Sequence, residues 1–176
     1  MLGADNQQER LETGNFLAGF VEGEGSFNIS LRRKADYKIS WQVVLSFNVS
    51  QRDPTLLYLL KQTLECGIIK KRFDGVHSFD VTTPRDVIDN VIPFFKEFPL
   101  RSKDKLHNFN LFVEAANLMK NGEHKTKDGL LKILMIREQI NLGKGRTRKY
   151  SIFDVFPKFS ESSETIRQLP LKVEMI

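Results

Sequence analysis

Two neighbouring segments of this 176-residue chain, 26–34 and 38–49, alternate between apolar and polar residues. Successive side chains of a β-strand point to opposite faces, so the alternation predicts two strands with one buried and one exposed face. The link between them, residues 35–37, is short enough for a hairpin. The chain must therefore form a sheet that is covered on one side. The apolar side chains that define this side are Phe27, Ile29, Leu31, Ile39, Trp41, Val43, Leu45, Phe47 and Val49.

The rest of the chain supplies two shorter strands and the helices that cover the sheet. Thr13 is predicted to cap the first helix and Gly25 to stop it, and Asp74-Gly75 is a strong turn signal between the shorter strands. Pro54 and Pro84 suit the first turns of later helices. The predicted elements are a helix at 12–24, strands at 26–34 and 38–49, a helix at 54–65, strands at 68–73 and 77–82, and helices at 84–98, 103–120 and 127–141.

The order α-β-β-α-β-β-α predicts an α+β fold with a four-stranded, mainly antiparallel sheet and helices on one face. We expect one domain over residues 1–176, with its core at about 12–141 and a C-terminal loop and helix at 142–176. Within that tail, a short helix is expected after Ser163. The chain is 40% hydrophobic and has 14 Phe, which excludes a disordered protein.

Charge favours a nucleic-acid partner, because the formal net charge is +5 and the pI about 9.3. The single cysteine, Cys66, excludes an internal disulfide and a cysteine-based zinc site. No apolar run has membrane-spanning length, and the first residues lack the pattern of a signal peptide. We therefore expect an intracellular protein, neither secreted nor bound to a membrane.

The polar face of the long strands is suited to DNA. A strand of nine or ten residues spans about 30 Å, or about nine base pairs, and a two-stranded ribbon fits the major groove. An ordinary solvent-exposed face is the alternative, but the outward positions of the first two strands contain no acid. The basic residues Lys34 and Lys105 are also predicted to contact the DNA. The residues predicted to read bases are Asn28, Ser30, Arg32, Lys38, Ser40, Gln42, Ser46, Asn48, Lys70, Arg72, Ser78 and Asp80.

The first helix ends in LAGFVEGEG, residues 17–25, where small residues recur. Ala18, Gly19 and Gly23 share one helical stripe, and the last two form a small-xxx-small pair. Glycine inside a helix costs about 1 kcal/mol relative to alanine, so two of them need a reason. A stripe of small residues lets another helix approach backbone to backbone. The pattern therefore predicts a helix pair.

The same segment places Glu22 and Glu24 at a helix C-terminus, where the macrodipole disfavours acids. Carboxylates beside unpaired carbonyl oxygens form an oxygen-lined, negative site of the kind that Mg²⁺ prefers. The alternative is a helix that simply ends in an acidic, glycine-rich loop. The residues alone leave both interpretations open.

LAGFVEGEG resembles the signature of the LAGLIDADG homing endonucleases, with Glu in place of Asp at both acids. The resemblance extends over residues 12–141 and more loosely to about 168. It implies a saddle-shaped sheet, with the signature helices of two halves packed together and their acids meeting over the minor groove of DNA. Because the chain has one such motif, the resemblance implies a homodimer on a near-palindromic duplex of roughly 20 base pairs.

The resemblance also implies roles for individual residues. Glu24 matches the metal-binding acid and the Gly23 carbonyl a second ligand, whereas Glu22 supports the helix pair. Gln51 resembles the polar residue that positions water, and Lys103 the basic residue beside the scissile phosphate. These matches make Glu24, Gln51 and Lys103 the expected catalytic residues. They make Ala18, Gly19, Glu22 and Gly23 the expected residues of the helix pair.

The resemblance has further implications for the basic residues, the metal and the reaction. A second basic residue of the family pocket aligns with Thr55, which is not basic, and Arg148 and Lys149 resemble a loop that contacts the DNA backbone. The implied metal is Mg²⁺, with Mn²⁺ as a substitute and Ca²⁺ as an inactive one. The implied activity is cleavage of both DNA strands that leaves 3′ overhangs. An RNA maturase of the same fold and a non-enzymatic DNA-binding regulator remain the alternatives.

Overall fold

The computed structural model describes residues 4–142 and 148–157, and the chain divides into two compact units, 1–144 and 145–176. The first unit contains the predicted core of 12–141. The second contains α7 (Ile152–Val155), which begins with a capping box between Ser151 and Asp154. The helix predicted after Ser163 lies outside the described residues, and a single domain reaching residue 176 stays a prediction.

The sheet has the order β1-β2-β4-β3, and its three strand pairs are all antiparallel. The predicted four-stranded antiparallel sheet is therefore confirmed. The predicted ends of the strands differ from the observed ones by up to three residues, and the largest difference is that the second strand begins at Trp41 and not at 38. Residues 34–40 form a turn in which the Lys34 amide donates to the Ser40 carbonyl at 3.0 Å, and Ser40 has a φ of 56°. The strands are β1 (Gly25–Arg33), β2 (Trp41–Gln51), β3 (Ile68–Lys71) and β4 (His77–Val81).

The first helix, α1 (Ala4–Glu24), is longer than predicted. It begins well before Thr13, so the prediction that Thr13 is its N-cap was wrong. Residues 7–12 are Gln, Glu, Arg and Leu, all good helix formers, and no proline separates them from the motif. A hydrogen bond of 2.7 Å from Gln8 to Glu12 adds local support.

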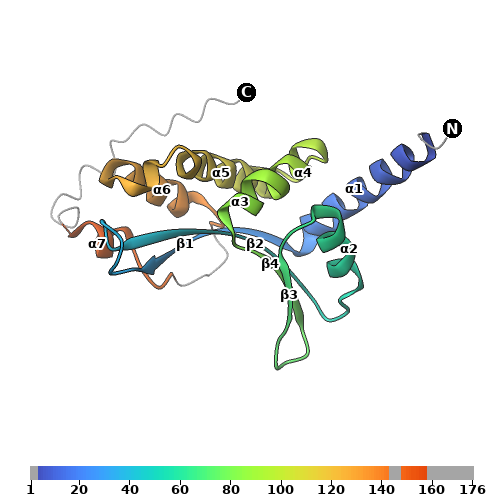
Figure 1. Ribbon diagram of the computed structural model, residues 1–176, viewed down its shortest axis with the longest axis horizontal. Coiled ribbons are helices and arrows are strands. Elements are labelled where there is room, and N and C mark those ends of the chain that lie inside the picture. The colour runs from blue at the N-terminus through green and yellow to red at the C-terminus, as the bar shows by residue number, and fades with distance from the viewer. Residues whose placement is uncertain (1–3, 143–147, 158–176) are drawn as a thin grey trace. The chain divides into compact units, whose positions relative to one another are not determined.

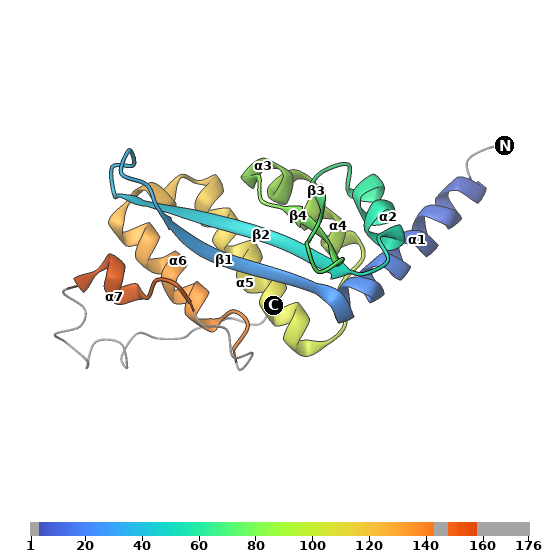
Figure 2. The same cartoon turned by 90° about the horizontal axis from the view of Figure 1, so that it is seen from below.

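Helices cover one face of the sheet, as predicted, and the strands lie bare on the other side of this unit (Figures 1 and 2). The predicted helix over 84–98 contains a π-helical turn. Pro93 follows this turn, and because proline has no N–H the regular bonding pattern cannot continue through it. The helices after α1 are α2 (Thr55–Leu64), α3 (Pro84–Asp86), η1 (Val87–Val91), α4 (Ile92–Glu97), α5 (Lys103–Lys120), η2 (Glu123–Lys125) and α6 (Lys127–Gln139).

Phenylalanine rings fill the space between the sheet and the helices. Phe27 of β1 stacks on Phe47 of β2 with ring centroids 5.2 Å apart, and Phe95 of α4 meets both rings edge-on. Phe109 and Phe112 of α5 also contact Phe27. The alternating apolar residues of the long strands therefore anchor α4 and α5 to the sheet.

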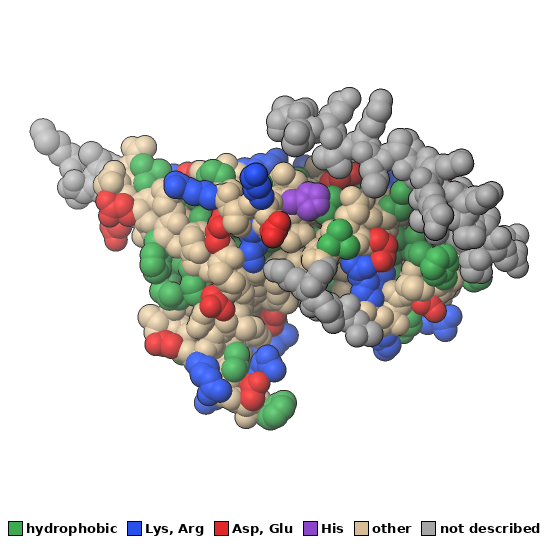
Figure 3. All heavy atoms as spheres, turned by 180° about the vertical axis from the view of Figure 1, so that it is seen from behind, with side chains coloured by type: hydrophobic (Ala, Val, Ile, Leu, Met, Phe, Trp, Pro, Cys, Tyr) green, Lys and Arg blue, Asp and Glu red, His purple; other side chains and the backbone are tan. Residues whose placement is uncertain are grey.

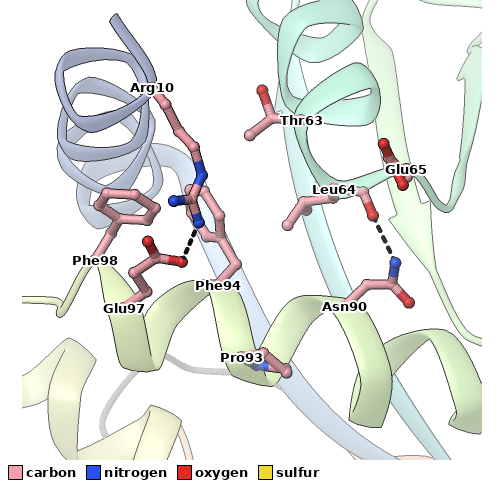
Figure 4. Close-up of a pocket in the computed structure, with 9 residues that line it drawn as sticks. All are labelled: Arg10, Thr63, Leu64, Glu65, Asn90, Pro93, Phe94, Glu97 and Phe98. Carbon is pink, nitrogen blue, oxygen red and sulfur yellow. Dashed lines mark hydrogen bonds and ion pairs between the residues drawn. The ribbon is translucent and has the colours of Figure 1, made fainter. Parts of the chain in front are cut away.

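Helices α1, α2 and α4 meet around a small cavity of about 190 Å³ (Figure 4). Arg10 of α1 forms an ion pair of 2.7 Å with Glu97, and the Asn90 amide donates to the Leu64 carbonyl at 2.9 Å. The second bond satisfies a carbonyl at the end of α2. These pairings hold the three helices together, so we interpret this cavity as structural.

Phe47→Ala tests the aromatic core. The side chain is fully buried at the centre of the cluster, so its loss should lower the free energy of unfolding by about 3–5 kcal/mol. The matched control is Phe73→Ala, in the turn between β3 and β4, where the ring is fully exposed; there we expect a change below about 0.5 kcal/mol. Urea unfolding of both variants measures the difference, and equal losses would contradict this description of the core.

Candidate functional site

Helix α1 passes directly into β1, with no intervening loop: the helix ends at Glu24 and the strand begins at Gly25. The predicted stop at Gly25 is confirmed. A Cβ atom on Gly25 would lie 2.4 Å from the Val21 side chain and 2.7 Å from the Val21 carbonyl oxygen. Only glycine fits this junction, which fixes the direction in which the last residues of α1 leave the core.

Glu22 is tied to the start of α5. Its carboxylate accepts hydrogen bonds from the backbone amides of Arg101 and Ser102, the latter at 3.0 Å. These amides lie at a helix N-terminus, where unpaired N–H groups favour an anion. An acid at the unfavourable end of one helix thus stabilises the favourable end of another. The predicted role of Glu22 in a helix pair stays a prediction, but this bond within the chain was not foreseen.

The ionisation of Glu22 reflects these contacts. Partial burial opposes ionisation, but the hydrogen bonds from Arg101 and Ser102 outweigh it and, with the charge of Lys105, lower the pKa of Glu22 below its usual value. Glu22 is therefore a carboxylate engaged within the fold. Of the two motif acids, Glu24 is the one left for a ligand.

Lys105 does not lie where the sequence placed it. Although predicted to contact DNA, its side chain is only 9% exposed, and its ammonium group donates to the Gly25 carbonyl. A lysine on α5 that follows the buried stripe of the helix cannot present its charge to a duplex. The prediction is corrected: Lys105 is a buried partner of the α1–β1 junction.

Three residues predicted for the active site line one open cavity of about 610 Å³: Gly23, Glu24 and Gln51. Gly23 and Glu24 come from the end of α1 and Gln51 from the end of β2. Glu24 and Gln51 are 27 residues apart in the sequence, and the β1–β2 hairpin brings them together because its register pairs Gly25 with Val49. Lys103, the third predicted catalytic residue, is exposed at the first position of α5 and does not line this cavity.

Asp53 and Thr55 also line this cavity, and sequence reasoning missed Asp53. The Asp53 carboxylate accepts hydrogen bonds from the Thr55 hydroxyl at 2.6 Å and the Thr55 amide at 2.9 Å. These bonds lower the pKa of Asp53. The signal was present, since an Asp just before the Pro-Thr start of a helix is typical of a capping residue.

The cavity offers oxygen donors to a divalent cation. The Glu24 carboxylate, the Gly23 carbonyl and the Gln51 amide are hard ligands of the type that Mg²⁺ and Ca²⁺ accept. Within residues 4–142 and 148–157, no three His, Cys, Asp or Glu side chains gather into a complete metal site. The donor set fits a metal that takes the rest of its ligands from water and a bound phosphate, as Mg²⁺ commonly does.

One face of α1 is open. Phe16 is 54% exposed, and nothing lies within 4 Å of a Cβ atom added to Gly19 or Gly23. These residues recur at helical spacing, so they form one stripe. Ala18 does not belong to this stripe, because it is only 6% exposed and packs inside the unit. The prediction for Ala18 is corrected, and the open stripe consists of Phe16, Gly19 and Gly23 with the half-buried Phe20.

The polar face of the sheet is continuous across its strands. The register places Arg32 beside Gln42, Asn48 beside Asp80, and Lys70 beside Ser78. Asp80 is tied to this face by the Ser78 hydroxyl at 3.0 Å and by Lys70 at 3.7 Å. Side chains exposed on the same face or at its ends are Ser30, Arg32, Lys70 and Arg72, and those partly exposed are Gln42, Ser46, Asn48, Ser78 and Asp80.

Asn28 is the exception on this face. Its side chain is 5% exposed, and its amide donates to the Ser26 hydroxyl at 2.9 Å and to Asn48 at 3.4 Å. Asn141, just after α6, donates to the Asn28 side-chain oxygen at 3.3 Å. Asn28 therefore supports neighbouring polar groups, which does not agree with the prediction that it reads bases directly.

The remaining residues predicted to contact DNA lie outside the strands. Lys34, Lys38 and Ser40 are exposed in the β1–β2 turn, so Lys38 and Ser40 are not strand residues as predicted. Lys and Arg side chains also gather at the projecting β3–β4 hairpin (Figure 3). Arg148 and Lys149 belong to the second unit, where the Lys149 amine lies 5.3 Å from the centre of the Tyr150 ring. Their contact with DNA stays a prediction.

None of the helices in the described part of the chain is long and apolar enough to cross a membrane. Cys66 is half-buried, and burial raises the pKa of its thiol to about 11. It is therefore a poor nucleophile. Neither feature points to a functional site other than the cavity at the end of α1.

The chain is similar in sequence to known endonucleases. A family model described as LAGLIDADG endonuclease matches residues 17–116. The DNA endonuclease I-CeuI of Chlamydomonas moewusii is 30% identical over 152 residues, which cover 82% of this chain and 70% of that protein. The probable intron-encoded endonuclease 3 of Neurospora crassa is 33% identical over 144 residues, 75% of this chain and 25% of that protein. The chain spans about a quarter to a third of the length of this and two other fungal relatives.

Solved structures are similar over the same region. The homing endonuclease I-TnaI is 34% identical with a TM-score of 0.70, and the match covers 74% of this chain and 88% of that one. I-SmaMI, bound to an uncleaved DNA target in the presence of calcium ions, is 32% identical with a TM-score of 0.68. That match covers 73% of this chain and 44% of I-SmaMI, so this chain resembles about half of the second protein.

Glu22→Gln tests the tie between α1 and α5. Because the pKa of Glu22 is lowered in the folded state, its ionised form stabilises the fold above the unfolded pKa near 4.5, and this contribution is lost as the pH falls through the folded pKa. We expect the variant to lose about 1 kcal/mol at pH 7, as for removal of a helix cap, and less below pH 4.5.

Urea unfolding at pH 7 and at lower pH measures this difference. The matched control is Glu9→Gln, an exposed acid on the same helix, which should change little at either pH. A loss for Glu22→Gln that stays constant across the acidic range would contradict the assigned bonds.

Proposed function

The chain belongs to the LAGLIDADG endonuclease family, and we propose that it is a site-specific homing endonuclease that cuts both strands of DNA. It acts as a homodimer on a near-palindromic duplex of roughly 20 base pairs inside the cell or organelle that encodes it. The cuts fall across the minor groove and leave 3′ overhangs. The observation that carries the proposal is the cavity in which Gly23, Glu24 and Gln51 lie together.

The bare sheet face supports DNA as the substrate. It presents amide, hydroxyl and basic side chains in register, which are the groups that read base edges and contact phosphates. Strand β2 has 11 residues, so at about 3.3 Å per residue it runs along about ten base pairs. The solved relative I-SmaMI, of which this chain resembles about half, was bound to a DNA target.

The reaction proceeds by hydrolysis of a phosphodiester. Glu24 and the Gly23 carbonyl would hold Mg²⁺, and the ion when bound would supply a Lewis acid for the phosphate and for the attacking water. Gln51 orients solvent through its amide, and Lys103 adds positive charge near the scissile phosphate. Mn²⁺ substitutes, and Ca²⁺ binds without supporting cleavage.

The open stripe of α1 supports a homodimer. Phe16 is exposed, and Gly19 and Gly23 leave room for a second helix to approach closely. A second copy of this stripe fits because a twofold axis brings identical residues together. The axis also places the two Glu24 cavities side by side, one for each DNA strand.

Glu24→Gln should abolish cleavage and retain DNA binding. The amide keeps the shape of the side chain but removes the charge that holds the metal, so we expect the cleavage rate to fall at least roughly 100-fold. The substrate is a library of randomised duplexes, from which sites cut by the wild type with Mg²⁺ are recovered and sequenced. Binding of the recovered site in Ca²⁺ should stay within about threefold.

A Glu24→Gln protein that cuts as fast as the wild type would rule out Glu24 as the metal ligand. Tight binding of DNA by the wild type, with no cutting in Mg²⁺ or Mn²⁺, would favour the maturase or regulator. The recovered ends also show whether the overhangs are 3′, since 5′ overhangs would exclude cutting across the minor groove.

Gly19→Leu should separate the homodimer. The isolated chain has space for the new side chain, but a leucine would hold two α1 helices apart, so the variant should sediment near 20.3 kDa and the wild type near twice that mass. Lys120→Leu, on the exposed end of α5, is the control and should remain dimeric. A wild type that sediments as a monomer, free and with DNA, would contradict the proposed assembly.

A further inference from the structure

Lys105 is a buried ionisable residue that the proposed reaction does not use. Lysine is almost never fully buried unless it is paired, because its charge loses solvation. In the part of the chain that the structure describes, Lys105 and Arg137 are the charged residues with less than a tenth of their surface exposed. Lys105 lies in the first turn of α5, against the end of α1. Its burial therefore requires an explanation at that junction.

Lys105 and its neighbours link the start of α5 to both sides of the α1–β1 junction. The ammonium group donates to the Gly25 carbonyl and lies close enough to Glu22 to stabilise its carboxylate. Glu22 in turn accepts hydrogen bonds from Arg101 and Ser102, the residues that lead into α5. The residues two before and one after Glu24 in the chain are thus both held by the same end of α5.

Glu24 itself is exposed, lines the cavity, and forms no hydrogen bond or ion pair within the described residues. No loop separates it from Gly25, so any movement of the Gly25 peptide moves Glu24 as well. Tight packing of Gly25 on Val21 restricts the peptide further. The position of the proposed metal ligand is therefore set by its neighbours and not by contacts of its own.

Electrostatics also favours a positive charge at the end of α1. The carbonyl groups at the end of α1 carry the negative end of the helix dipole, and Glu22 and Glu24 add two further charges. α1 has no basic residue in its last turn. The positive charge of Lys105, delivered from α5, offsets part of this concentration of negative charge.

We propose that Lys105 is a positioning residue for cleavage: its buried ammonium group holds the α1–β1 junction in the conformation that presents Glu24 to the cavity. This inference rests on the proposed nuclease function. A purely structural lysine would contribute to stability alone. A positioning residue affects the rate of the bound complex while leaving DNA affinity in place, because the DNA-binding face lies on the other side of the sheet from α5.

The test compares Lys105→Met, which keeps the length of the side chain without its charge, with Lys120→Met at the exposed end of the same helix. Hydrogen exchange measured by mass spectrometry follows peptides from residues 17–30 and, as an internal reference, 127–139. We expect faster exchange only in the 17–30 peptides of Lys105→Met. Lys105→Gln, which keeps a donor and leaves room for water, replaces it should Lys105→Met not fold.

Single-turnover cleavage of a recovered site is measured with the same proteins. The rate of Lys105→Met should fall at least roughly tenfold, with DNA binding in Ca²⁺ within about threefold, while Lys120→Met stays near the wild type. Unchanged exchange at 17–30 would overturn the proposal, as would a rate and an affinity that fall together. A wild type that never cuts would contradict the nuclease, whereas the exchange data would still decide whether Lys105 holds the junction.

Discussion

The change from helix to strand at Gly25 is the constraint on which the rest of the structure depends. Within one peptide bond the chain leaves the open stripe of α1 and enters the first strand of the sheet. A side chain at Gly25 would collide with Val21, so the turn has little freedom. The α1 stripe, the Glu24 cavity and the polar sheet face therefore keep a fixed spatial relation, and each constrains what the others can bind.

Two acids of one short motif have different environments and hence different roles. Glu22 accepts hydrogen bonds from the backbone at the start of α5, and the positive charge of Lys105 stabilises its carboxylate, so Glu22 has a structural role. Glu24, two residues on, is left exposed at a cavity lined also by Gln51. The fold thus pairs one acid with internal donors and leaves the other exposed at the cavity, where we propose that a cation binds. The unfavourable placement of acids at a helix C-terminus is explained without treating both as metal ligands.

The sequence predicted the sheet and its polar face well, because alternation directly reports which side of a strand is buried. The family resemblance pointed to Glu24 in the motif and to Gln51 after the second strand, and the β1–β2 register brings them to one cavity. Prediction from the sequence failed where tertiary contacts decide. The burial of Lys105 depends on which side of α5 meets α1, and the burial of Asn28 depends on a side chain 113 residues away. The local pattern of residues does not report either contact. Helix α1 extends past its predicted cap because good helix formers precede Thr13.

The central claim is that two copies of this chain, joined through α1, each cut one strand at their own Glu24. Mixed dimers test it most directly: wild-type and Glu24→Gln chains carrying different affinity tags are produced together, and the species with both tags is purified. The account predicts that this species nicks a single strand of the target and makes no double-strand break. Double-strand breaks made by the mixed species at the wild-type rate would show that one chain suffices for both cuts and would contradict the claim.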